Sequence, residues 1–186
     1  GTETIPRVFK IFGPGNQFVT AAKQLVQQYG VAIDMPAGPS EVAVFADESA
    51  NAAYVAADLL SQAEHGIDSQ VLLVTTAEKM ILQVQAEIDR QIQNLSRREI
   101  AQKALENSKF ILLNNENEAM ELLNVYAAEH LILATDRSME LSEKVINAGS
   151  VFLGHHSPES VGDYASGTNH TLPTNGYATA YSGVSV

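Results

Sequence analysis

A glutamine and a histidine stand one helical turn apart in the stretch SQAEHG, at the end of an otherwise apolar helical segment. Val55, Leu59 and Gln62 fall at i, i+4 and i+7, so Gln62 continues the core-facing stripe of that helix. His65 is expected on the same side in the last turn, and Gly66 to end the helix in a left-handed conformation. An amide oxygen and a neutral imidazole can both bind a metal ion. The other interpretation is a helix-ending histidine bonded to a carbonyl, with Gln62 half exposed.

The tripeptide AEH occurs in that stretch and again at 128–130, directly before the apolar run LILAT. Glu129 and His130 would supply two proton-handling groups with different pKa values at the start of a strand. Because side chains alternate along a strand, both can serve one site only if the chain bends there. The other interpretation is a solvated Glu129 and a His130 bonded to the backbone.

A third group of polar residues lies in the Gly- and Ser-rich stretch GHHSPESVGDYASGTNH, which contains Asp163, His155, His156 and His170. Binding residues often lie on such loops. Neighbouring side chains seldom reach one ion together, so we expect His155 and His156 to be an exposed pair. Asp163 is the better candidate for a carboxylate ligand of a metal.

The turn GPGN (13–16) opens a predicted helix. Backbone N–H groups at a helix start attract anions, so the turn could hold a phosphate. It lacks the full glycine fingerprint of dinucleotide sites. Asn16 could cap the helix equally well, and the motif leaves both interpretations open.

Strand and helix patterns alternate along the rest of the chain. Near-continuous apolar strands between amphipathic helices predict an α/β protein with a Rossmann-like, largely parallel sheet flanked by helices. The expected strands are 8–12, 31–36, 41–46, 71–76, 109–114, 130–135 and 150–154, and the expected helices are 18–29, 52–65, 77–95, 97–107, 116–126 and 138–148. The turn in MPAGPS predicts a boundary there, with residues 1–38 ending one Rossmann-like domain and residues 39–186 forming a second that carries most candidate site residues.

The position of these candidates in the predicted sheet is unusual. Open parallel sheets generally bind ligands beyond the carboxyl ends of their strands. His65 and the pair Glu129–His130 instead precede their strands, which places them at the opposite edge. Asp163 follows the strand 150–154, so its segment must fold back or that strand must run the other way.

Composition excludes several classes of protein. Acidic residues outnumber basic ones 22 to 11, with a formal net charge of −11 and no basic patch, which argues against nucleic-acid binding. The pair Arg97–Arg98 is expected on a solvated helix face. The chain has no cysteine, which excludes disulfides, thiolate zinc sites and a cysteine nucleophile. No apolar run approaches the ~20 residues of a membrane span. The first residues, GTETIPRVFKIFGPG, and the last, AYSGVSV, suggest a piece cut from a longer chain.

Five segments resemble histidinol dehydrogenases and follow the order of that family: KIFGPGNQFVTAAKQLV, AIDMPAGPSEV, ADLLSQAEHGIDSQVLL, EHLIL and AGSVFLGHHSPESVGDYASGTNHTLPTNGYA. AIDMPAGPSEV followed by SQAEHG is highly specific. The resemblance implies a zinc enzyme that oxidises L-histidinol to L-histidine through L-histidinal with two NAD⁺ in succession. It also implies a cytoplasmic location, or a plastid if the source is a plant.

Motif by motif, the resemblance implies that Gln62, His65 and Asp163 are zinc ligands. Hard oxygen donors and one imidazole suit zinc and leave room for a substrate nitrogen. The same three residues, together with Ser40 and His130, are implied to contact the substrate.

The resemblance makes His130 the general base for the alcohol, and it makes Glu129 the group that activates water for attack on the aldehyde. Asn16 would contact NAD, and His170 would lie close to the substrate. The family's chain is much longer at both ends, and its C-terminal portion supplies another zinc ligand and a substrate carboxylate from the partner subunit of a homodimer. This chain alone is therefore expected to have an incomplete site.

Two rival hypotheses come from other classes. The chain could be a non-catalytic α/β piece that serves only in packing or dimerisation. It could also be a zinc hydrolase that uses Glu129 and a metal-bound water, which would turn over substrate without NAD⁺.

Overall fold

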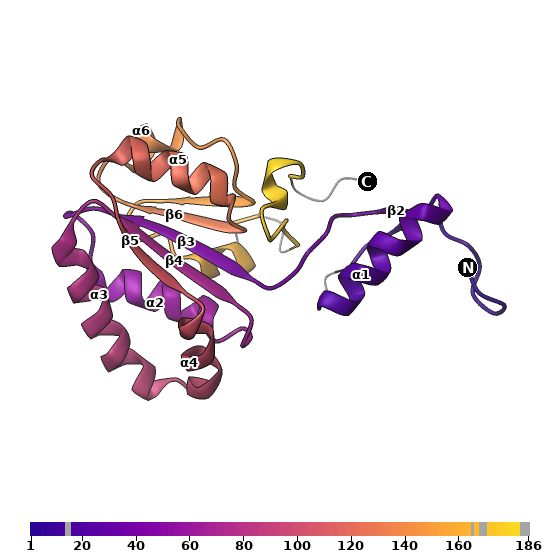
Figure 1. Ribbon diagram of the computed structural model, residues 1–186, viewed down its shortest axis with the longest axis horizontal. Helices are drawn as coiled ribbons and strands as arrows, with labels where there is room; N and C mark the ends of the chain where they lie inside the picture. The colour runs from indigo at the N-terminus through magenta and orange to yellow at the C-terminus, as the bar shows by residue number, and fades with distance from the viewer. Residues whose placement is uncertain (14–15, 165, 168–170, 183–186) are drawn as a thin grey trace.

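The computed structural model describes residues 1–13, 16–164, 166–167 and 171–182. Two sheets organise these residues (Figure 1): a five-stranded sheet with the order β5–β4–β3–β6–β7 and a two-stranded sheet of β1 and β2. The strands are β1 (Lys10–Ile11), β2 (Ala32–Ile33), β3 (Glu41–Ala46), β4 (Gln70–Thr75), β5 (Lys109–Leu112), β6 (His130–Ala134) and β7 (Ser150–Leu153). The helices are α1 (Gln17–Val26), α2 (Ala52–Ala63), α3 (Glu78–Gln91), α4 (Arg98–Glu106), α5 (Glu116–Tyr126) and α6 (Ser138–Ser142).

Every strand pair in both sheets is parallel. The central strand β3 is buried along its whole length, and its residues alternate between two cores. Val42 and Val44 pack with α2, α3 and α4 on one face, while Ala43 and Phe45 pack with α5 and α6 on the other (Figure 1). A sheet covered on both faces requires apolar residues at consecutive positions, which explains the near-continuous apolar strands. The predicted α/β fold with a largely parallel sheet is confirmed.

Several predicted helices end earlier than expected. The segment 77–95 is α3 followed by a 3-10 turn, Ile92–Asn94, and 18–29 is α1 followed by the 3-10 turn Gln27–Tyr29. The predicted helix 138–148 stops at Ser142. There the side-chain oxygen of Asn124 accepts hydrogen bonds from the backbone N–H groups of Ile146 (2.6 Å) and Asn147 (3.2 Å), which takes those donors away from a helix.

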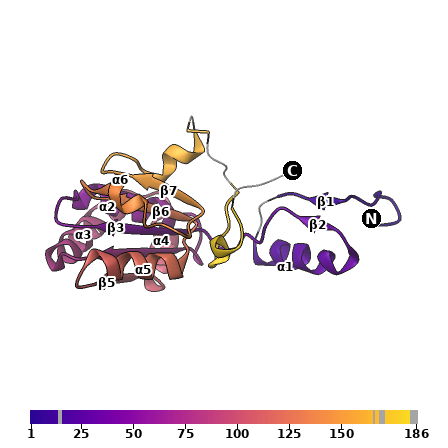
Figure 2. The same cartoon turned by 90° about the horizontal axis from the view of Figure 1, so that it is seen from above.

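The two-stranded sheet lies beside α1, to one side of the larger sheet (Figure 2). The expected strand 8–12 is reduced to the two residues of β1. Two hydrogen bonds join residues of the first part to the C-terminal segment: Gly38 N–H donates to Thr174 Oγ1 at 2.5 Å, and Gln24 Nε2 donates to the Tyr177 hydroxyl at 3.2 Å. The two sheets fall on either side of residue 38, and the division into two domains there stays a prediction. Among the helices of the described residues, none has both the length and the apolar character that a membrane crossing requires.

Candidate active site

The amino-terminal ends of β3, β4 and β6 bring the candidate residues to one edge of the sheet. Glu41 pairs in register with Gln70, and Val42 pairs with His130, so these three strands begin at the same level. Ser40 precedes β3 directly, and its carbonyl accepts a hydrogen bond from Gln70 N–H at 3.1 Å. Glu129 precedes β6 in the same way. The parallel register therefore gathers the residues that stand immediately before the strands.

Gln62 lies in the last turn of α2 and is only 1% exposed. Both polar atoms of its side chain, Oε1 and Nε2, are buried without a hydrogen-bond partner among the described residues. Leaving a buried polar group unsatisfied costs ~1–3 kcal/mol. The predicted core-facing stripe is confirmed, and the half-exposed interpretation is wrong. An amide oxygen held in this way fits a ligand of a metal ion, because such an ion would satisfy it.

The end of α2 differs from the prediction. The helix stops at Ala63, and Glu64 caps it with its N–H donating to the carbonyls of Leu60 and Gln62. Gly66 does not adopt the left-handed conformation. A Cβ atom there would come within 2.9 Å of Asp68 Oδ1, the end of an exposed side chain that would have to move away.

His65 belongs to this turn and its side chain is exposed. Its N–H donates to the carbonyl of Gln62 at 3.2 Å, and its carbonyl accepts from Arg97 Nη2 at 3.2 Å. The backbone of His65 is thus fixed from two sides while the imidazole faces outward. Gln62 and His65 do not share one helical stripe, because His65 lies beyond the last residue of α2 and is joined to Gln62 by a backbone hydrogen bond. Arg97 and Arg98 are exposed as expected.

Glu129 and His130 lie close together despite the alternation of strand side chains. Glu129 is 7% exposed, and its Oε2 accepts a hydrogen bond from the backbone N–H of Glu41 at 3.0 Å. Its Oε1 lies 3.8 Å from Nε2 of His130. Because Glu129 stands just before β6, its side chain turns toward the start of β3. The solvated interpretation of Glu129 is wrong.

The ring of His130 packs on the ring of Phe152 from β7, with the centroids 5.9 Å apart. The side chain is 14% exposed, so the imidazole is largely surrounded yet reachable from the edge of the sheet. This arrangement can do acid–base chemistry, since it pairs a buried carboxylate with an accessible imidazole.

A second buried carboxylate, Glu41, was not among the predicted site residues. It is 5% exposed, Oε1 accepts from the N–H of Asn175 at 2.9 Å, and Oε2 has no hydrogen-bond partner among the described residues. Burial raises the pKa of Glu41, and burial together with the nearby Glu41 charge raises the pKa of Tyr126. A glutamate that opens the otherwise apolar strand EVAVFA, next to Ser40, was the signal in the sequence.

The segment after β7 folds back along α2. β7 is parallel to β6, so the interpretation with a reversed strand is wrong. The rings of Tyr54 and His156 lie 5.6 Å apart near the start of α2, and Ser61 near its end donates to Glu159 Oε2 at 3.0 Å. The chain therefore runs from the carboxyl edge back toward the amino edge. The backbone of Asp163 ends the short 3-10 helix η3 (Glu159–Asp163) on this path.

Two predicted residues cannot be compared with the structure in full: the Asp163 side chain and all of His170 lie outside the described residues. Nowhere in the part of the chain that the structure describes do three His, Asp or Glu side chains converge on one point. The predicted zinc ligands would not form such a cluster, because Gln62 is an amide and the Asp163 side chain lies outside the described residues.

The adjacent histidines separate in the structure. His156 is exposed, as predicted. His155 is half-buried, with a side chain 21% exposed and Nε2 at 3.0 Å from Asp136 Oδ1, so the expectation of an exposed pair is wrong for this residue. Asp136 follows β6, which places His155 at the carboxyl edge of the sheet, away from Gln62 and Glu129.

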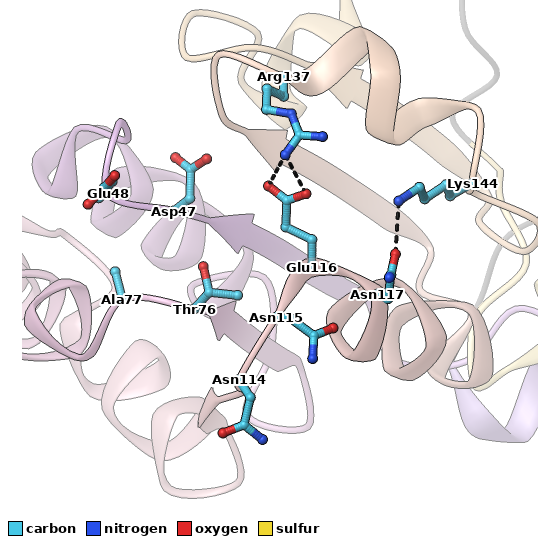
Figure 3. A pocket seen from close by; sticks show the side chains of 10 residues that line it. All are labelled: Asp47, Glu48, Thr76, Ala77, Asn114, Asn115, Glu116, Asn117, Arg137 and Lys144. Atoms are coloured by element: carbon cyan, nitrogen blue, oxygen red, sulfur yellow. Dashed lines mark hydrogen bonds and ion pairs between the residues drawn. The ribbon is translucent and has the colours of Figure 1, made fainter.

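That carboxyl edge holds a pocket of about 620 Å³ (Figure 3). Its lining residues are Asp47, Glu48, Thr76, Ala77, Asn114, Asn115, Glu116, Asn117, Arg137 and Lys144. The two cations bind protein groups: Arg137 pairs with Glu116 at 2.7 Å, and Lys144 Nζ lies 2.9 Å from Asn117 Oδ1 (Figure 3). None of the predicted site residues lines this pocket. The unsatisfied polar atoms of Gln62 and Glu41 make the amino edge the better candidate for an active site.

Asn16 caps α1: its Oδ1 accepts from the N–H groups of Phe18 (3.0 Å) and Val19 (3.2 Å). Gly13, the first residue of the turn, is held from two sides, since its N–H donates to Asp34 Oδ2 at 2.8 Å and Lys23 donates to its carbonyl at 2.8 Å. The capping interpretation is confirmed, and a contact of Asn16 with NAD stays a prediction. Residues 14 and 15 of the turn lie outside the described part of the chain.

We expect Asn16→Ala to lower the free energy of unfolding by ~1 kcal/mol, the usual effect of losing an N-cap side chain. Asn16→Asp should leave it unchanged, because a carboxylate oxygen accepts the same two hydrogen bonds. Denaturant unfolding followed by circular dichroism measures both. Equal stability of the alanine and aspartate variants would contradict a capping contribution.

Comparisons with known proteins agree with one another. The family model described as "Histidinol dehydrogenase" matches residues 1–186. A histidinol dehydrogenase of Bacteroides thetaiotaomicron is 68% identical over 186 residues, which are 100% of this chain and 44% of that protein. The chain thus spans less than half the length of the curated relatives it matches.

Solved structures give the same result. The crystal structure of histidinol dehydrogenase from Elizabethkingia anophelis superposes with a TM-score of 0.94 at 60% identity, over 100% of this chain and 43% of that one. A propionaldehyde dehydrogenase mutant from Clostridium phytofermentans superposes with a TM-score of 0.51 at 14% identity, over 93% of this chain and 52% of that one. The second likeness concerns the α/β fold alone.

Proposed function

The chain belongs to the histidinol dehydrogenase family, and we propose on that basis that it supplies the central part of a zinc- and NAD-dependent oxidation of L-histidinol to L-histidine through L-histidinal. The observation that carries the proposal is the buried side chain of Gln62, whose amide lacks a partner among the described residues beside the edge that holds Glu129 and His130. We also propose that the chain divides at residue 38, so that residues 1–38 end one Rossmann-like domain and residues 39–186 form a second.

Gln62 Oε1, the His65 imidazole and the Asp163 carboxylate would hold the zinc ion. The burial of Gln62 supports its part, because the amide would gain a partner for a group that is otherwise costly to bury. When bound, zinc would orient the nitrogen groups of the substrate, and NAD⁺ would accept hydride. A fourth protein ligand and a substrate carboxylate would come from the partner subunit of a homodimer.

His130 would take the alcohol proton on its ring, at the open side of the sheet edge. Glu129 would act in the second oxidation by removing a proton from the water that attacks the aldehyde. The backbone N–H of Glu41 holds Oε2 of Glu129, and Oε1 faces His130, so the carboxylate is oriented before any substrate arrives. Ser40 would contact the substrate beside them, and Asn16 would contact NAD.

A full-length chimaera tests this proposal. In it, the 186 residues replace the matching segment of the Bacteroides thetaiotaomicron relative, which is 68% identical. We expect the purified chimaera to contain zinc and to form NADH from L-histidinol. The chimaera with Gln62→Ala should bind zinc more weakly, and the 186-residue chain alone should form no NADH.

The same measurements separate the rival functions. A folded chimaera with neither zinc nor NADH formation would favour a non-catalytic packing or dimerisation unit. Turnover that does not require NAD⁺ would favour a zinc hydrolase. Either result would overturn the proposal.

A further inference from the structure

Two acidic residues, Asp58 of α2 and Glu159 of η3, lie close together where these two segments meet. Glu159 opens η3 and is 5% exposed. Its backbone N–H interacts favourably with the carboxylate of Asp58, which lies on α2. The hydroxyl of Ser61 lies 3.0 Å from Glu159 Oε2 and 2.9 Å from the backbone carbonyl of Asp58. Both Asp58 and Ser61 of α2 therefore contact Glu159 of η3.

These contacts lie close in the sequence to two predicted zinc ligands. Gln62 stands one helical turn after Asp58, and Asp163 stands four residues after Glu159. The hydrogen bond from Ser61 to Glu159 and the approach of Asp58 to Glu159 attach the start of η3 to the last turns of α2. Because Asp163 ends the same short 3-10 helix, this attachment bears on where Asp163 lies along α2.

We propose that Asp58, Ser61 and Glu159 form a carboxyl latch that positions Asp163 relative to Gln62 and His65. These are positioning residues, because they act on the metal site through the two segments that they join. The inference rests on the proposed zinc site, and it concerns residues to which that proposal gives no role.

The electrostatics of the carboxyl latch agree with this geometry. Burial, and the charge of Glu159 beside it, raise the pKa of Asp58 to about 7. The charge of Glu159 disfavours ionisation of Asp58, so a pKa near 7 leaves Asp58 partly protonated at neutral pH. The other titratable groups that line the groove at Asp58 are Tyr54, His155 and His156. A neutral Asp58 removes the repulsion that would otherwise separate α2 from η3.

Zinc affinity of the full-length chimaera tests the carboxyl latch, measured by competition with a chelator. We expect Asp58→Ala and Glu159→Ala to weaken zinc binding by ~10- to 100-fold, as replacement of groups that orient metal ligands usually does. Asp58→Asn and Glu159→Gln should retain the parent affinity within a few-fold, because each amide can still accept the hydrogen bond that its carboxyl group accepts. Glu116→Ala is the matched control, since it breaks an ion pair at the opposite edge.

If these residues served only in packing, their replacement would lower the stability of the protein and leave its zinc affinity unchanged. The thermal unfolding of the zinc-free variants is therefore measured alongside. Should an alanine variant fail to fold, Ser61→Ala removes only one hydroxyl and is expected to weaken zinc binding several-fold. Unchanged zinc affinity in a folded Glu159→Ala variant, or in Ser61→Ala, would overturn the carboxyl latch.

The result distinguishes this inference from the proposed function. If Gln62→Ala weakens zinc binding and the variants of the carboxyl latch do not, the latch is wrong and the zinc site stands. If the parent chimaera binds no zinc, the proposed function fails first, and the carboxyl latch fails with it.

Discussion

Asparagine in place of His130 should abolish the oxidation of L-histidinol in the chimaera while zinc stays bound. A general base contributes ~10²- to 10⁴-fold in rate, so a loss of that size is expected. The change is local, because asparagine is polar and smaller than histidine at a position that is 14% exposed and packs on Phe152. NADH formation from L-histidinol, together with the zinc content of the same sample, measures the effect.

His156→Asn is the matched control for this experiment. His156 is an exposed histidine whose ring lies against Tyr54 near the start of α2, and its replacement should leave both readouts unchanged. Loss of zinc from His130→Asn in proportion to the lost activity would contradict a role as base, and would instead make His130 part of the metal site.

The strands could be predicted from the sequence because the sheet is covered on both faces. In β3 every residue is buried, so EVAVFA has no polar face and its apolar run is visible without any knowledge of its neighbours. Helix ends could not be predicted to the same degree. The helix that begins at Ser138 ends at Ser142, and the N–H groups of Ile146 and Asn147 are bound instead by Asn124, a residue of another helix.

The candidate site shows the same limit. The burial of Gln62 followed from its spacing to Val55 and Leu59, which is a local property of one helix. The environment of Glu41 could not be predicted from its local sequence, because its Oε1 accepts a hydrogen bond from the N–H of Asn175, 134 residues further along the chain. Long-range contacts of this kind are invisible to periodicity.

The conflict over the two sheet edges also has a structural resolution. Asp163 follows a strand whose carboxyl end lies beside Asp136, at the edge opposite to Gln62. The chain then returns along α2 through the contacts of His156 and Glu159, which is the direction that a ligand from this segment would need to take. The proposed site at the amino edge would thus use a segment whose described part forms only the short 3-10 helix η3.

Glu129→Gln should slow the oxidation of L-histidinal much more than that of L-histidinol. Glutamine retains an oxygen that can accept the N–H of Glu41, so the side chain keeps its place at the start of β6. It loses the basic carboxylate, and activation of water for the second step should fall by ~10²-fold or more, within the usual range for general bases. The first oxidation, which would use His130, should change by less than ~10-fold, below that range.

Single-turnover NADH formation, started from either L-histidinol or L-histidinal, separates the two steps. With the alcohol as substrate, the variant should form the first equivalent of NADH at nearly the parent rate and the second much more slowly. Glu48→Gln, at the carboxyl edge, is the control and should behave as the parent does. Equal slowing of both steps would show that Glu129 acts on the site as a whole, through its 3.8 Å approach to His130 or its bond to Glu41, and the division of labour between the two residues would be wrong.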